Sequence, residues 1–71
     1  MKLRDVFGPT GQPGSPRVYL SDRGTAGVQG LRIDSRSKAT AEPPCPGQED
    51  IVEVPIDLIH AASAALKEMG L

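Results

Sequence analysis

The chain has few aromatic residues and a single cysteine. Its 71 residues include one phenylalanine, one tyrosine and no tryptophan, which excludes a core built on large aromatic side chains. Cys45 cannot form an internal disulfide and has no second thiol with which to bind a metal. It lies among prolines, with no histidine nearby to activate it, so we expect an inert, exposed thiol. A chain of this kind suits a reducing compartment, and we expect a cytoplasmic protein.

Long apolar runs and clusters of chemically active residues are also missing. No apolar run approaches the ~18 residues of a membrane span, and residues 1–5 carry charge without the apolar stretch of a signal peptide. The one histidine, His60, lies three residues from both Asp57 and Ser63 on a predicted helix. Such a set on one exposed helix face has no pocket and no oxyanion hole. We therefore expect no catalytic residues, no metal and no cofactor.

The last third of the chain predicts a strand that runs directly into a helix. Ile51, Val52 and Val54 are β-branched, which favours a strand. From Pro55 onward, apolar residues recur at steps of three and four, as on a helix with one buried face. These residues are Leu58, Ile59, Ala62, Ala65, Leu66 and Met69. Pro55 fits a first helical position and Gly70 a left-handed stop, which predicts a helix over 55–69.

A hairpin is predicted over residues 17–34. Residues 17–21 alternate as a strand with Val18 and Leu20 facing the core, and residues 22–25 have turn chemistry. A second strand follows, with a bulge at Gly30 that would return the apolar residues on either side of it to one face. The predicted fold class is α+β, with a small three-stranded antiparallel sheet. Hairpin 17–34 and strand 50–54 form this sheet, and the C-terminal helix packs on it.

Proline and glycine concentrate between the predicted elements. Residues 8–16 hold three glycines and three prolines in nine positions, and residues 35–49 contain no large aliphatic or aromatic side chain. The sequence thus predicts a flexible N-terminal segment over 1–16, then one small domain over 17–71 with a mobile loop at 35–49. Within the N-terminal segment, Leu3, Val6 and Phe7 fit either one helical turn or an added edge strand.

Charge is unevenly distributed along the chain. Residues 1–38 carry a formal charge of +4 and residues 39–71 a charge of −5. One interpretation is a solvated surface that also helps two copies, or the two halves of one chain, attract each other. The other is a basic hairpin face that contacts nucleic acid. The residues available for that contact are Arg17, Arg23, Arg32, Arg36 and Lys38.

The strand and helix at the C-terminus also predict an interaction surface. Ile51 should point away from Val52 and Val54, so it is exposed unless a partner, or Leu3 and Phe7 of the same chain, covers it. The candidate interaction residues are Ile51, Glu53, Leu58, Leu66 and Met69. A chain this small gains only ~3–5 kcal/mol from its own core, which favours self-association as a homodimer or binding to a protein partner.

Several short motifs resemble those of known proteins. The passage from strand through Val54-Pro55 into the helix is similar to ribbon-helix-helix repressors and to looped-hinge transcription factors. Ribbon-helix-helix proteins, however, have a second helix and present basic or amide side chains to DNA, where this strand presents Asp50 and Glu53.

A second resemblance covers residues 18–59. Tyr19-Leu20, residues 22–25, residues 28–30 and residues 53–55 followed by Leu58 resemble short, uncharacterised actinobacterial (Streptomyces-like) proteins found near helix-turn-helix regulators. In those proteins the segment matching 35–49 is more helical and more apolar. The resemblance implies a non-enzymatic accessory or regulatory protein that acts through protein–protein contacts, with a helix-turn-helix regulator as one candidate partner. The alternative is a small dimeric DNA-binding regulator.

Overall fold

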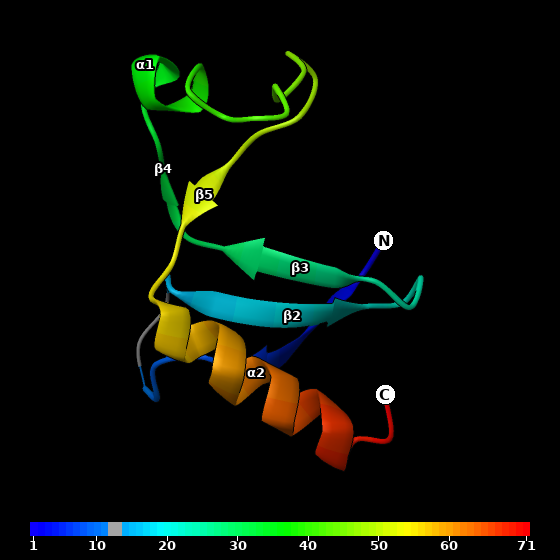
Figure 1. Cartoon of the computed structure of the whole chain (residues 1–71). Helices are drawn as coiled ribbons and strands as arrows, with labels where there is room; N and C mark the ends of the chain where they lie inside the picture. The colour runs from blue at the N-terminus through cyan, green and yellow to red at the C-terminus, as the bar shows by residue number, and fades with distance from the viewer. Residues whose placement is uncertain (12–13) are drawn as a thin grey trace.

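A three-stranded antiparallel sheet, covered on one face by the C-terminal helix, forms the centre of the protein (Figure 1). This is seen in a computed structural model that describes residues 1–11 and 14–71. The elements in chain order are β1 (Leu3–Phe7), β2 (Arg17–Ser21), β3 (Ala26–Gln29), β4 (Leu31–Arg32), α1 (Ser35–Lys38), β5 (Val52–Glu53) and α2 (Ile56–Glu68). The larger sheet has the order β1-β2-β3, and β4 and β5 form a separate pair. The predicted α+β class, with one C-terminal helix on a three-stranded antiparallel sheet, is confirmed.

The predicted hairpin turn between β2 and β3 is confirmed. Gly24 has a φ of 77°, in the left-handed region that glycine adopts at little cost. The Ser21 N–H donates to the Thr25 carbonyl at 2.8 Å, and the Gly24 N–H donates to the Ser21 carbonyl at 3.2 Å. The Ser21 hydroxyl also accepts from the backbone N–H groups of Arg23 and Thr25, each at 3.1 Å. These bonds explain how a serine is buried here, since its polar atom is satisfied by the turn.

The third strand of the sheet is not the one that the sequence predicted. Segment 50–54 was expected there, but the place is taken by β1, which pairs with β2 from Leu3 opposite Ser21 to Phe7 opposite Val18. Residues 1–16 are therefore not wholly outside the folded unit. The register shifts between Asp5 and Phe7, and Val6 packs against the core. Burial of the Val6 side chain therefore favours pairing of this segment with the sheet.

Strand β5 instead pairs with β4, so the second strand of the hairpin is split between two sheets. The split occurs at Gly30, where a bulge was predicted. A Cβ atom on Gly30 would collide with the Glu53 carbonyl oxygen and would lie 2.6 Å from Val54 Cγ1. Glycine is needed here because another strand's backbone passes against it, so the predicted bulge is wrong. Residues 31–53, called the arm below, project from the larger sheet (Figure 1).

The C-terminal helix closely follows its prediction. Pro55 is the N-cap residue, Asp57 lies in the first turn and Lys67 in the last, where each charge complements the helix dipole. Gly70, with a φ of 82°, ends the helix. The Leu71 N–H donates to the Leu66 carbonyl at 3.0 Å, the long closing bond of a glycine-terminated helix.

The core between helix and sheet is small. Its buried apolar residues are Val18, Leu58 and Ala62, exposed by 3%, 5% and 4%, with Val6 and Val54 packed against them. Within the described residues no large side chain is completely enclosed. The helix packs on β1 and β2. Strand β3 is thus left as the least covered strand on that side.

Candidate interaction surface

Large apolar side chains remain exposed over much of the molecule. Among the described residues nine are exposed: Met1, Leu3, Phe7, Val28, Leu31, Ile56, Ile59, Met69 and Leu71. The exposed fraction reaches 75% at Ile56 and 66% at Leu31. Single exposed apolar residues are ordinary on protein surfaces, but contiguous apolar patches mark contact sites. Two such patches stand out, one on α2 and one beside its first residue.

The patch on α2 is a stripe at steps of three, four and three residues. We call it the helix seam, and it consists of Ile56, Ile59, Ser63 and Leu66. At 100° per residue these four lie within about 80° of one another, and the centre of the seam is roughly 100° around the helix from the buried side. Leu66 is half-buried and the other three are exposed. Apolar side chains of α2 therefore extend around the helix beyond the side that packs on the sheet.

The second patch is an open hollow of about 450 Å³ beside the start of α2. It is lined by Ser15, Pro16, Leu31, Glu53, Val54 and Pro55. The rigid rings of Pro16 and Pro55 also border a neighbouring hollow lined by Phe7 and Ala61. Glu53 and Asp57 are the charged residues that line the two hollows. The arrangement offers an apolar surface with an acidic rim.

The five interaction residues predicted from the sequence lie in different parts of the structure. Leu58 is in the core and is not available for contact. Leu66 belongs to the helix seam, and Met69 is 41% exposed near the end of α2. Ile51 is half-buried in the arm, while Glu53 is exposed at the rim of the hollow. Ile56 and Ile59 are the exposed seam residues that this choice omitted. Ile59 belongs to the steps of three and four that suggested a helix, whereas Ile56 lies three residues before it and was not part of that set.

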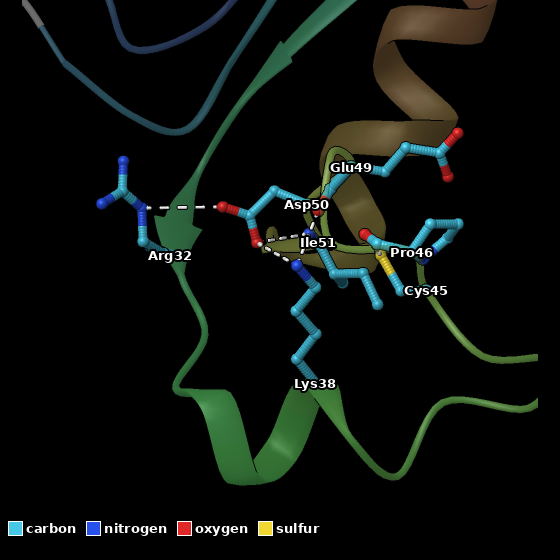
Figure 2. A network of polar contacts seen from close by, with 7 residues as sticks. All are labelled: Arg32, Lys38, Cys45, Pro46, Glu49, Asp50 and Ile51. Carbon is cyan, nitrogen blue, oxygen red and sulfur yellow. Dashed lines mark hydrogen bonds and ion pairs between the residues drawn. The ribbon is translucent and has the colours of Figure 1, made fainter.

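Of the two sequence-based alternatives for Ile51, the structure does not show the one in which Leu3 and Phe7 cover it. Leu3 and Phe7, which were expected to fold over it in one of them, belong to β1 and remain 51% and 42% exposed. Ile51 instead lies in the arm, where its backbone N–H donates to Asp50 Oδ1 at 2.9 Å (Figure 2).

A polar network holds the two ends of the arm together (Figure 2). Lys38 Nζ donates to the Glu49 carbonyl at 2.6 Å and lies 3.9 Å from an Asp50 carboxylate oxygen. Arg32 Nε lies 3.8 Å from the other oxygen of Asp50. These contacts are exposed, and exposed ion pairs contribute only ~0–1 kcal/mol. The network links residues on either side of the segment that was predicted as a mobile loop, but it buries no apolar side chains there.

Residues 35–38 of that segment form α1, which is capped at its first turn. The Asp34 carboxylate accepts a hydrogen bond from the Ser37 N–H at 2.6 Å. This backbone hydrogen bond, followed by that of the Ser37 hydroxyl, lowers the pKa of Asp34. The aspartate thus explains why a short helix begins here in a polar stretch.

The five basic residues proposed for nucleic acid do not form one patch. Arg17 donates to Asp5 Oδ1 and to the Pro9 carbonyl, each at 2.6 Å, and only 12% of its side chain is exposed. Arg23 is in the turn between β2 and β3, at the opposite end of β3 from the arm. The remaining three lie on the arm: Arg32, Arg36 and Lys38. Arg17 therefore stabilises the fold by linking β2 to Asp5 and Pro9. On the arm, Asp50 partly neutralises the positive charge of Arg32 and Lys38.

The polar residues of α2 show no catalytic arrangement among the described residues. Asp57, His60 and Ser63 are exposed, and no hydrogen bond links their side chains. Cys45 is half-buried, and its thiol donates to the Pro46 carbonyl at 3.8 Å. Over residues 1–11 and 14–71 there is no group of three or more potential metal ligands. The helices of this same region are too short or too polar to cross a membrane.

No match to the chain was found among protein-family models, curated proteins or solved structures. The actinobacterial and repressor resemblances therefore stay predictions, and function is inferred from the chain itself.

Proposed function

We propose that this chain is a non-enzymatic accessory or regulatory protein that acts through protein–protein contacts and associates with itself. The observation that carries the proposal is an imbalance among the described residues, where three apolar residues are buried and nine large apolar ones are exposed. A single core is marginal in a chain of this size, and association is one way in which such a chain gains further apolar burial.

The size of the molecule supports the same proposal. Its accessible surface is 5617 Å², whereas a compact monomer of 7.5 kDa exposes about 4,200 Å². The radius of gyration is 13.4 Å, against about 11 Å for a compact domain of this length. The excess surface of about 1,400 Å² exceeds the ~800 Å² that each partner loses in a standard interface.

Light scattering on the purified chain over a range of concentrations tests this proposal. We expect the mass to rise from the 7.5 kDa of one chain toward twice that value. The double variant Arg23→Ala/Arg32→Ala should associate as the wild type does, because these arginines are exposed and lie outside the apolar patches. Ile51→Asp is a poorer probe, because Ile51 is half-buried and its loss would also disturb the arm.

The same proteins discriminate protein contact from DNA binding. A DNA-binding regulator would bind duplex DNA with an affinity that falls steeply with salt, and the double arginine variant would lose much of that affinity. Under the present proposal, association is unchanged by the two arginine substitutions and no salt-dependent DNA binding accompanies it. A wild-type chain that stays monomeric while binding DNA in this way would overturn the proposal.

A further inference from the structure

The helix seam lies on the flank of α2 that faces the uncovered strand of the sheet. On the opposite flank, Asp57 and Ala61 line a hollow together with Phe7 of β1. Because the strand order is β1-β2-β3, the flank away from β1 faces toward β3. The seam residues Ile59 and Leu66 therefore lie on the β3 side of the helix.

Strand β3 is bare on this side because one helix cannot cover three strands. Strands lie about 4.8 Å apart and a helix is about 10 Å across, so a helix covers roughly two strands. Here α2 lies over β1 and β2. Val28 of β3 pairs with the buried Val18 and so shares its face of the sheet. Yet Val28 is 44% exposed. The seam and Val28 together border a space of the right kind for a second helix.

The structure assigns this space to α2 of a second copy of the chain, packed seam against seam. The inference rests on the proposed self-association and names its surface and symmetry. Two copies suffice, because each brings one helix and one bare β3. The whole molecule exposes about 1,400 Å² more than a compact monomer of its mass, and a standard interface removes ~800 Å² from each partner. Steps of three and four along the seam are those of helices that pack side by side.

The position of β3 also sets the direction of the two helices. The partner's helix would lie over β3 of the first copy. If the partner's sheet lay on the same side of the two helices as the first sheet, it would collide with this β3. The two sheets must enclose the helices from opposite sides, which requires a two-fold axis along the helix pair. The helices are then parallel, and each seam residue meets its own equivalent in the partner. Ile59 packs on Ile59 of the other copy, and Ser63 on Ser63.

Disulfide trapping tests this arrangement residue by residue. In a Cys45→Ser background, single cysteines are introduced as Ile56→Cys, Ser63→Cys and, as the matched control, Ala64→Cys. Ala64 is exposed on the flank away from the seam. Disulfides need Cα atoms within about 7 Å, so Ile56→Cys and Ser63→Cys should each form covalent dimers at least ~10-fold faster than Ala64→Cys. Both must do so, because parallel helices bring every equivalent pair together.

The outcomes separate this inference from the proposed function. Crosslinking at Ser63→Cys alone would mean antiparallel helices and would overturn the parallel arrangement. Crosslinking at neither position, with light scattering still showing a dimer, would overturn the seam and leave self-association standing. A wild-type chain that is monomeric throughout would overturn both. As an independent check, Ile59→Glu should weaken dimerisation at least ~10-fold, as an unpaired buried charge does, while Leu31→Glu should not. Equal effects of the two would contradict the seam.

Discussion

At the scale of single residues, the structure gives a reason for Gly30 that the sequence did not. The alternation of apolar residues slips at this position, and that slip correctly marks it as special. The predicted reason was a bulge, whereas the structural reason is the close approach of Glu53 and Val54 from a distant part of the chain. Local pattern shows that a strand is interrupted, but a contact between residues 30 and 53 depends on the tertiary fold.

The contact of Gly30 with β5 predicts a strong effect of a single added methyl group. Gly30→Ala should lower the free energy of unfolding by about 2 kcal/mol, because the Glu53 backbone cannot move aside as a flexible side chain would. Gly47→Ala is the matched control, since its added Cβ meets no atom within 4 Å. Its effect should stay within about 0.5 kcal/mol. Urea denaturation measures both, and equal midpoints for the two variants would refute the close approach.

At the scale of elements, predictability follows the length of the pattern. Helix α2 was predicted almost to its ends, because its 13 residues carry apolar periodicity, suitable charges and a glycine stop. The sequence of β1 does not decide between a helical turn and an edge strand, since its five residues have Arg4 and Asp5 near their centre. The two-residue strands β4 and β5 are too short for periodicity, and their pairing is set by the chain around them. Of the helix seam, which we propose as the contact surface, the sequence-based choice included Leu66, but the flank that stays uncovered depends on where β1 lies.

The difference between the arm and the rest of the chain predicts a difference in local stability. Amide hydrogens in α1 should exchange with solvent far faster than those in the middle of α2. The arm has exposed ion pairs and no buried apolar residue, whereas α2 includes Leu58 and Ala62 of the core. Hydrogen exchange followed by NMR measures each amide. Equal protection of α1 and α2 would show that the arm is part of one cooperative core.

At the scale of the whole molecule, the central feature is a fold that covers too little of its own apolar surface. One helix covers about two of three strands, the arm projects from the sheet, and the molecule measures 36 × 25 × 21 Å along its principal axes. Composition predicted a marginal core, and the structure shows that β3 is the strand whose apolar face is left uncovered. A second copy that places its helix over β3 would supply the missing layer.

Small-angle X-ray scattering over a concentration series is the sharpest test of the proposed dimer, because it measures mass and shape together. We expect a mass that approaches about 15 kDa, twice the 7.5 kDa of the chain, with a compact dimer whose two sheets enclose the paired helices. The contradicting result is a mass of 7.5 kDa at every concentration, with a radius of gyration no larger than that of one copy.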